Sequence, residues 1–204
     1  MSDVEPGKRE LRRQILAARA RLSQEDAEKA PLVLSERARE LPELARARTV
    51  AAYVSVGREP GTRPLLDALR EAGVRVLLPV LLPDDDLAWG VYGGADALMP
   101  AARGRGLLEP AEPHLTPSAV TEADAVLLPG LAVDASGMRL GRGGGSYDRV
   151  LARLAAAGAA PPLVVLLYDG EVLPRVPAEP HDRPVTAAVT PSGVHRFGRR
   201  AERP

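Results

Sequence analysis

The sequence predicts an α/β fold: a mainly parallel, partly mixed sheet flanked by helices on both faces, in a Rossmann-like three-layer arrangement. One observation is a strand–helix–strand pattern, in which apolar segments at 49–56 and 74–80 enclose a helical segment at 62–72 that closes at Gly73. Another is the fully apolar segment 163–168, which is typical of a strand buried on both faces of a parallel sheet.

Two helices are predicted before the first strand. Residues 8–22 carry a stripe of apolar residues at helical spacing: Leu11, Ile15, Ala18 and Leu22. Ser23 followed by Asp26 resembles a capping box and predicts a second helical region that runs to about Leu41. Pro31 lies within this region. Because proline cannot donate a backbone hydrogen bond, we expect the region to be kinked or divided there.

The rest of the chain alternates strands and helices less regularly. Short strands are predicted at 87–92 and 124–128, and an edge strand at 185–190. A helix is predicted at 147–157, where apolar residues return to helical spacing. Residues 99–117 are rich in proline and glycine and are interpreted as an irregular connection.

Length and composition limit the possible functions. The chain has 204 residues, enough for one sizeable α/β domain and few for two, so we expect one domain over residues 1–196 and a flexible tail over 197–204. Lys and Arg together number 27, as do Asp and Glu, and the formal net charge of zero gives no general attraction to nucleic acid or to an anionic membrane. The absence of cysteine excludes disulfides, thiolate metal sites and a cysteine nucleophile.

The sequence also shows no targeting or membrane-spanning segment. Residues 1–7 are polar, and no apolar run approaches the roughly 18 residues of a membrane span. We therefore expect a cytoplasmic, monomeric protein whose partners are small molecules, with neither nucleic acid nor membrane among them.

The most unusual segment is RLGRGGGSYD, residues 139–148, which places four glycines and two arginines directly before a predicted helix. Clustered glycines indicate positive φ angles or close approach to a ligand, and backbone amides before a helix can bind phosphate. The segment lacks the lysine of a P-loop. Gly141, Gly143 and Ser146 form an incomplete dinucleotide-binding pattern that begins too far after the preceding strand. A flexible, solvated turn fits the segment as well as phosphate binding does.

The glycine-rich segment lies within LLPGLAVDASGMRLGRGGGSYDRVLARL, residues 127–154. Three other segments accompany it: KRELR at 8–12, AAYVSVGREPGT at 51–62 and EPHDRPVTAAVT at 179–190. In this order, the four segments resemble those of the 5-formyltetrahydrofolate cyclo-ligase (methenyltetrahydrofolate synthetase) family. The resemblance implies a ligase that uses ATP and Mg²⁺ to close 5-formyltetrahydrofolate into 5,10-methenyltetrahydrofolate, with phosphorylation of the formyl oxygen and release of ADP and phosphate. Ser146 departs from the pattern, because many members carry a tyrosine there.

The resemblance also implies a set of site residues. ATP is expected to bind Lys8, Arg12, Arg139, Gly141, Arg142, Gly143, Gly144, Gly145, Ser146 and Tyr147. The candidate catalytic residues are Arg142, Lys8 and Tyr147, and the candidate Mg²⁺ ligands are Asp148 and Asp182. Folate is expected to bind Glu59, Tyr147 and Trp89. The carboxylate of Glu59 suits this role because it can accept paired hydrogen bonds from the N–H groups of a pterin.

Ordinary structural roles compete with these assignments. Lys8 and Arg12 also fit a solvated helix edge, and Asp148 fits a helix N-terminus, which attracts a carboxylate. Asp182 fits a turn, and Trp89 fits a buried packing position. Two other functions also stay open. One is a sugar-phosphate isomerase or CoA-transferase-like enzyme that needs no ATP, and the other is a non-catalytic folate- or nucleotide-binding relative.

Overall fold

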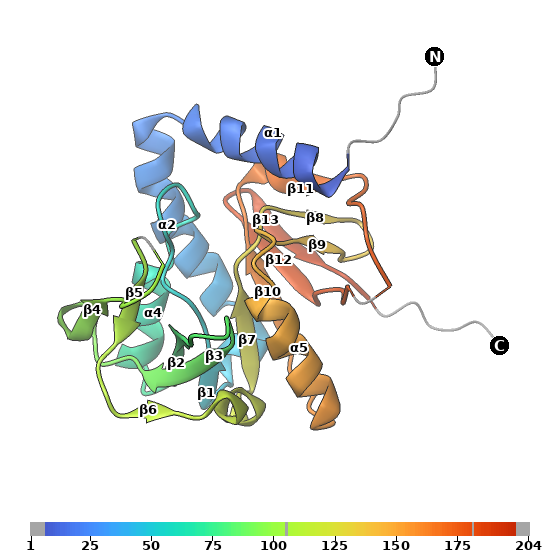
Figure 1. Ribbon diagram of the computed structural model, residues 1–204. Coiled ribbons are helices and arrows are strands. Elements are labelled where there is room, and N and C mark those ends of the chain that lie inside the picture. Colours follow the sequence, from blue (N-terminus) through green and yellow to red (C-terminus); the bar gives the residue numbers. More distant parts are fainter. Residues whose placement is uncertain (1–6, 105, 181, 199–204) are drawn as a thin grey trace, which may run out of the picture.

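The computed structural model describes residues 7–104, 106–180 and 182–198, and within them an eight-stranded sheet forms the centre of the fold (Figure 1). From one edge to the other its strands are β13 (Gly193–Arg196), β12 (Ala187–Thr190), β10 (Leu163–Leu166), β7 (Ala125–Leu128), β1 (Thr49–Ala51), β2 (Arg75–Leu81), β3 (Leu87–Val91) and β6 (His114–Leu115). The strands from β12 to β2 run parallel, and β13, β3 and β6 pair antiparallel to their neighbours. The predicted α/β class with a mainly parallel, partly mixed sheet is confirmed.

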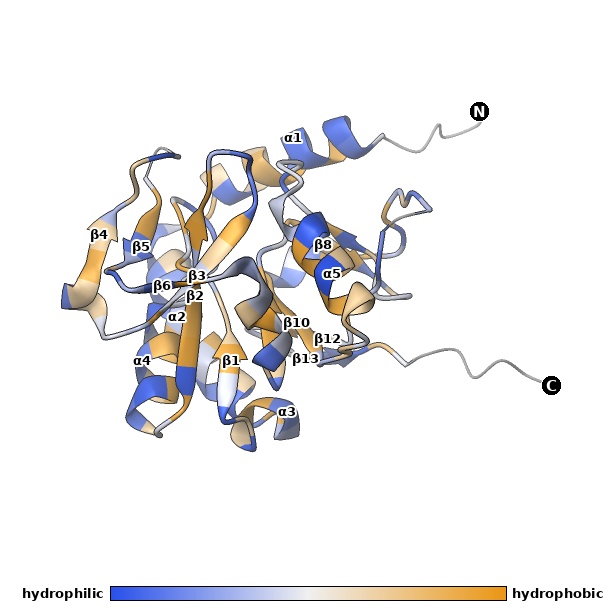
Figure 2. Ribbon diagram, turned by 60° about the horizontal axis from the view of Figure 1, so that its bottom comes forward, coloured by the Kyte–Doolittle hydropathy of each residue, from blue (hydrophilic) through white to orange (hydrophobic). Residues whose placement is uncertain are grey.

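Helices cover both faces of this sheet. One face packs against α2 (Gln24–Arg39), α3 (Pro42–Ala45) and α4 (Arg63–Glu71), and the other against α5 (Ser146–Ala156) and the 3₁₀ helix η2 (Pro117–Glu122). Neighbouring side chains along a strand enter opposite layers, so Val50 packs on the side of α2 and Ala51 on the side of α5. The central strands are therefore apolar on both faces, and β2 and β10 are coloured mainly as hydrophobic in Figure 2.

A smaller sheet continues the chain beyond the carboxyl ends of β7 and β10. Its strands, in order, are β11 (Val172–Leu173), β8 (Ala132–Asp134) and β9 (Arg139–Leu140). Helix α1 (Lys8–Ala20) packs on this sheet through Leu11 and Ile15 (Figure 1). The strands were not predicted, because two or three residues are too few to show the alternation of a strand.

The buried face of α1 differs from the predicted stripe in its last turn. Leu11 and Ile15 are buried as expected, but Ala18 is exposed and Arg19 is buried. A charged residue does not enter an apolar pattern, so periodicity could not assign Arg19 to this face. Its charge is compensated by Glu171, whose carboxylate oxygen lies 2.6 Å from the Arg19 Nε.

Helix α2 runs through Pro31, so of the two expected outcomes, a kink or a division, the division does not occur. The helix begins after Ser23, whose hydroxyl accepts a backbone N–H of the first turn, as predicted. Pro31 packs closely on the loop at Gly61, where an added Cβ would lie 2.6 Å from the proline Cγ. Burial of Leu34 on the sheet side adds to this packing and compensates for the missing hydrogen bond.

Three other segments differ from their predicted form. Strand β1 ends at Ala51, because the chain then leaves the sheet in a loop that leads to α4. The connection at 99–117 is more regular than expected, since it contains β6 and most of the hairpin formed by β4 (Leu98–Pro100) and β5 (Leu108–Pro110). Strand β12, predicted at an edge, is internal because β13 pairs with its outer side.

Part of the predicted tail is in contact with the fold. Phe197 donates its N–H to the Thr186 carbonyl at 2.9 Å and packs against the core, whereas residues 199–204 lie outside the described residues. In the part of the chain that the structure describes, no helix has both the length and the apolar character needed to cross a membrane.

Asp134 in β8 organises the turn to β9, and its substitution should destabilise the protein. Its carboxylate accepts backbone N–H groups of Ser136, Met138 and Val176, and the hydroxyl of Ser136. Hydrogen bonds to a charged group contribute substantially when buried, so Asp134→Ala should lower the free energy of unfolding by about 2–3 kcal/mol. Urea denaturation at pH 7 measures this loss, with the exposed Asp96→Ala as a control.

The same loss should depend on pH. Burial acts to raise the pKa of Asp134, but the hydrogen bonds from Ser136, Val176 and Met138 outweigh burial and lower it. A carboxyl group of this kind stabilises the fold above its unfolded pKa, about 3.9, and loses that contribution as pH falls through the native pKa. The stabilities of wild type and Asp134→Ala should therefore converge in acid. A gap that is equal at pH 7 and in acid would contradict this role.

Candidate functional site

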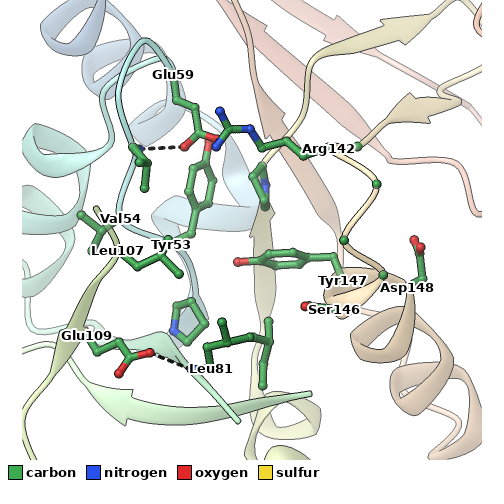
Figure 3. A pocket seen from close by; sticks show the side chains of 18 of the residues that line it. Tyr53, Val54, Glu59, Leu81, Leu107, Glu109, Arg142, Ser146, Tyr147 and Asp148 are labelled. Carbon is green, nitrogen blue, oxygen red and sulfur yellow. Dashed lines mark hydrogen bonds and ion pairs between the residues drawn. The ribbon is translucent and has the colours of Figure 1, made fainter. Parts of the chain in front are cut away.

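A cavity of about 250 Å³ opens at the carboxyl ends of β1, β2 and β7 (Figure 3). In open α/β folds this edge of the sheet is where connecting loops diverge and ligands bind. The wall of the cavity combines the loop after β1, the end of β2, residues 107–109, and the glycine-rich loop 141–145 with the first turn of α5. Segments far apart in the sequence therefore meet at one place.

The glycine-rich loop has the unusual backbone that its composition predicted. Gly143 and Gly145 have φ angles of 93° and 79°, a region that other residues rarely adopt. Gly145 immediately precedes α5, so the loop leads directly into the N-terminus of that helix. The free amides and the dipole of a helix N-terminus favour a bound anion. Because the loop and residues 146–148 both line the cavity, an anion can reach them there.

Helix α1 brings two predicted cations to the neighbourhood of this loop. Arg12 donates from Nε to the Gly141 carbonyl at 2.9 Å, and its Cζ lies 3.2 Å from where a Cβ on Gly143 would be. Lys8, one turn earlier, donates to the Asp182 carboxylate at 2.7 Å and lies 3.1 Å from that of Glu179. Burial acts to lower the pKa of Lys8, but the two carboxylates outweigh it and raise the pKa, so the amine stays charged.

Arg139 places a buried positive charge in the cavity wall. Its side chain is 7% exposed, and its Nη1 donates to the Pro129 carbonyl at 2.8 Å. Within the described residues, its buried Nε has no hydrogen-bond partner, and the Asp148 carboxylate is 3.9 Å from Nη2. Burial lowers the pKa of Arg139 against the attraction of Asp148. The guanidinium nevertheless stays charged at neutral pH, so the cavity wall offers donors to an anion.

Arg142 and Glu59 form an ion pair across the cavity (Figure 3). The Arg142 Nη1 lies 3.3 Å from the Glu59 carboxylate, and their side chains are 50% and 7% exposed, respectively. The second carboxylate oxygen of Glu59 accepts the Val56 N–H at 2.8 Å, which fixes the carboxylate in its loop. Glu59 is therefore the fixed member of the pair, and Arg142, on the glycine-rich loop, is the member that can exchange it for another partner.

Two tyrosines line the cavity between these charged groups. Tyr147, in the first turn of α5, points its ring into the cavity in Figure 3, and its buried hydroxyl has no hydrogen-bond partner among the described residues. Tyr53 follows β1 and is 4% exposed. Burial, followed by the charge of Glu59, raises the pKa of both side chains. Both hydroxyls therefore stay protonated at neutral pH, and that of Tyr147 can donate to a bound molecule.

The rest of the cavity wall is largely apolar. The sequence did not predict these apolar lining residues. Pro79 and Leu81 of β2 form one side, and Leu107 and Leu108 another. Glu109 of β5 belongs to the same wall and accepts the Leu81 N–H at 2.8 Å (Figure 3). This hydrogen bond fixes residues 107–109 against the end of β2. Because the two segments are far apart in the sequence, no local sequence pattern predicts the contact.

The two candidate metal ligands, Asp148 and Asp182, differ in their exposure and in their hydrogen-bond partners. Asp148 lines the cavity with a side chain that is 52% exposed, so its oxygens are accessible to a cation. Asp182 accepts Lys8 and also the Glu179 N–H at 2.7 Å. Among the described residues, which exclude His181, no three acidic or histidine side chains are grouped to hold a metal ion.

Trp89 does not reach the cavity. Its side chain is 0% exposed and packs in the core layer between the sheet, η2 and α5. Most of the other predicted site residues lie together: Glu59 and residues 139 and 141–148 line one cavity. Arg12 is outside the cavity lining and contacts the glycine-rich loop through the Gly141 carbonyl.

The fold and the cavity define a class of protein: an α/β protein in which a cavity at the carboxyl edge of the sheet joins a glycine-rich loop with arginines to an apolar wall. The 5-formyltetrahydrofolate cyclo-ligase of Mycolicibacterium smegmatis is 47% identical over 149 residues, which cover 71% of this chain and 74% of that protein. The protein of the same name from Escherichia coli is 35% identical over 158 residues, covering 75% and 83%. The solved 5,10-methenyltetrahydrofolate synthetase of Aquifex aeolicus matches with a TM-score of 0.79 and 29% identity over 96% of both chains. This chain belongs to the 5-formyltetrahydrofolate cyclo-ligase family, which it matches over residues 4–191.

The buried charge of Arg139 in the cavity wall predicts that the free protein binds inorganic pyrophosphate in the cavity. A ligand that binds only the folded state stabilises it by mass action, so pyrophosphate should raise the Tm. Arg139→Met should abolish most of this rise, which thermal denaturation across a pyrophosphate titration measures.

Arg37→Met is the matched control for this substitution. Arg37 also donates to a proline carbonyl, that of Pro191 at 2.8 Å, but does not line the cavity. Its variant should keep the full pyrophosphate effect. An unchanged rise in Arg139→Met would show that the anion binds elsewhere.

Proposed function

We propose that this protein is an ATP-dependent 5-formyltetrahydrofolate cyclo-ligase, which closes 5-formyltetrahydrofolate to 5,10-methenyltetrahydrofolate and releases ADP and phosphate. One observation carries the proposal: a single cavity joins a cationic, glycine-rich end to an apolar end that contains tyrosines and carboxylates. A triphosphate suits the first end, and a pterin ring suits the second. Membership of the family supports the same activity.

The nucleotide is assigned to the glycine-rich end. The amides of Gly141 to Gly145 and the N-terminus of α5 would hold phosphate oxygens, with Ser146 and Tyr147 in the first helical turn. Arg139 supplies a buried charge, whose Nε has no hydrogen-bond partner among the described residues, and Arg142 supplies a half-exposed charge. Arg12 secures the loop through the Gly141 carbonyl, and Lys8 stands one turn beyond it.

Mg²⁺ is assigned to the same end, because Mg²⁺ usually takes one or two carboxylates and completes its shell with phosphate oxygens and water. Asp148 fits this requirement, since its carboxylate is accessible at the cavity and near Arg139. Asp182 already accepts a hydrogen bond from Lys8, so we assign it an indirect role. The ion would neutralise charge on the phosphates when bound.

The folate is assigned to the apolar end. The pterin ring would lie between Tyr53 and the leucine and proline side chains of β2 and residues 107–108. Glu59 would accept its N–H groups, as the sequence suggested, and these donors would replace Arg142 as the partner of the carboxylate. Trp89 is left out of this assignment, because it lies in the core.

The chemistry explains why the two substrates must meet. The formyl group on N5 is an amide, so its carbon resists attack by N10 and its oxygen leaves poorly. Transfer of the γ-phosphoryl group to the formyl oxygen breaks the β–γ bond of ATP and releases ADP. N10 then attacks the formyl carbon, the new N–C bond forms, the C–O bond breaks with loss of phosphate, and the N10 proton is released.

The protein contributes position and charge to this reaction rather than a covalent intermediate. Phosphoryl transfer depends on alignment and on neutralisation of the charge on the transferring group. Arg142 and Lys8 are the cations assigned to that charge. Arg142 is on the loop that would hold the phosphates, and Lys8 lies one helical turn before Arg12, which contacts that loop. Tyr147 is placed between the two halves of the cavity, where its protonated hydroxyl can donate to the formyl oxygen or to phosphate.

A direct assay tests the proposed activity. The purified protein should convert 5-formyltetrahydrofolate to the methenyl product, followed by its near-ultraviolet absorbance, only when ATP and Mg²⁺ are both present. ADP should form in a one-to-one ratio with the product. Absence of product with ATP intact would rule out this function. Turnover of a sugar phosphate without ATP would favour the isomerase alternative instead.

Neighbouring glycines offer a sharp test of the nucleotide assignment. Gly143→Ala should raise the KM for ATP roughly tenfold, because a left-handed conformation costs other residues about 1–2 kcal/mol and the new methyl would press on Arg12. Gly144→Ala is the matched control: its φ is ordinary and its Cβ would meet no atom within 4 Å. Steady-state kinetics should show a selective change in Gly143→Ala. Equal effects of the two substitutions would contradict this explanation.

The domain organisation, the cellular location and the oligomeric state are also proposed. One domain over residues 1–196 is supported by a sheet whose strands come from residues 49 to 196. A cytoplasmic location and a monomeric state are proposed with the small-molecule function, and size-exclusion chromatography with light scattering tests the latter.

A further inference from the structure

Arg19, in the last turn of α1, makes several buried polar contacts outside the cavity lining. Its Nε and Nη2 donate to the two carboxylate oxygens of Glu171 at 2.6 and 2.9 Å, and Nη2 also donates to the Gly130 carbonyl at 2.8 Å. Both side chains are buried, at 2% and 7% exposure. The guanidinium also lies 5.7 Å from the centre of the Tyr168 ring. The Arg19 guanidinium and the Glu171 carboxylate are therefore held in fixed orientations by their hydrogen bonds.

The partners of Arg19 come from the carboxyl edge of the central sheet. Gly130 follows β7, and Glu171 belongs to the 3₁₀ helix η3 (Asp169–Glu171), which follows β10. The Glu171 carboxylate also accepts the Tyr168 N–H at 3.0 Å, so it is held from its own side. Arg19 thus attaches the end of α1 to the edge of the sheet at which the cavity opens.

The spacing along α1 connects this attachment to the site. Lys8, Arg12, Ile15 and Arg19 follow one another at intervals of four, three and four residues, so they share one face of the helix. Arg19 fixes one end of this face. Arg12, about two helical turns before Arg19 on the same face, donates the hydrogen bond to the glycine-rich loop.

A second route leads from Arg19 to the cavity through the backbone. Arg19 holds the carbonyl of Gly130, and Arg139 holds that of the preceding residue, Pro129. Gly130 is tightly packed, since a Cβ there would lie 2.6 Å from the Val165 side chain and 3.5 Å from the Arg139 Cγ. A shift of this peptide would therefore be transmitted to Arg139.

This buried pair is better suited to positioning than to stabilising the fold. Desolvation offsets much of the attraction in a buried ion pair, and apolar residues of similar volume often stabilise a protein as well. In the described part of the chain, the buried Nη1 of Arg19 also lacks a hydrogen-bond partner. The pair does fix the orientation of Arg19 relative to Glu171, because a guanidinium and a carboxylate form their two hydrogen bonds in one plane.

We propose that Arg19 is a positioning residue for the nucleotide half of the site: through Glu171 and Gly130 it sets where α1 presents Arg12 and Lys8 and where Arg139 stands. This inference rests on the proposed function for its kinetic consequence but not for its structural one. Arg19 itself does not line the cavity and is not assigned to touch either substrate.

Arg19→Lys tests the proposal, because lysine keeps the charge but cannot span Glu171 and Gly130 in one plane. The KM for ATP should rise roughly tenfold or more, since a small misplacement of binding groups is costly, while the KM for 5-formyltetrahydrofolate should change less than about twofold. Arg196→Lys is the matched control, because Arg196 makes the same two-bonded pair with Glu43 away from the cavity. It should leave both constants unchanged.

A measurement without ligand separates this inference from the function. Hydrogen exchange of the free protein should become faster in the α1 amides of Arg19→Lys, with the amides of β1, β7 and β10 unchanged. Unchanged exchange in α1 together with an unchanged KM for ATP would overturn the proposal, as would equal rises in both KM values. If wild type makes no product, the proposed function fails, and the exchange result still decides the positioning role.

A second variant covers the case in which lysine prevents folding. Replacing the pair with Arg19→Met and Glu171→Met together removes the buried charges and keeps long apolar side chains, which a core usually tolerates. The proposal expects a folded protein with the same selective rise in the KM for ATP. Normal ATP kinetics in this folded variant would overturn it.

Discussion

The chemistry of this cavity depends on the buried positive charge of Arg139, which is incompletely paired within the part of the chain that the structure describes. Burying a charge is costly unless acceptors surround it, and the Arg139 guanidinium has the Pro129 carbonyl but a distant carboxylate in Asp148. The fold keeps it there because β9 and the packed peptide at Gly130 leave it little freedom. In the proposed function an anion supplied from outside would compensate this charge, and a helix N-terminus such as that of α5 favours the same kind of ligand.

The two halves of the cavity are connected by the ion pair of Arg142 and Glu59. While the pair is intact, the carboxylate assigned to the pterin and the guanidinium assigned to the triphosphate neutralise each other. Under the proposed function, binding of either substrate would compete with this contact and would leave the other partner available to the second substrate. Since Arg142 is half-exposed and sits on a glycine-rich loop, exchange requires little rearrangement of the core.

Local patterns in the sequence anticipated much of the fold and the charged part of the site. Helical spacing located α1, the apolar segment 163–168 indicated a buried strand, and the glycines of 141–145 indicated a special loop before α5. The misses share one cause, which is that the stabilising contact lies elsewhere in the chain. Arg19 is buried only because Glu171 meets it, and Pro31 is tolerated because neighbouring segments pack around its helix.

By itself the sequence determined the α/β class and, through its resemblance to a family, a list of site residues, because periodicity and motif are properties of neighbouring residues. Only the tertiary structure decided which of them share a cavity: Glu59 and Arg139 do, Trp89 packs in the core, and Asp182 binds Lys8. It also added Tyr53 and the wall at 107–109. Such contacts depend on how strands far apart in sequence are ordered in the sheet, which no local pattern encodes.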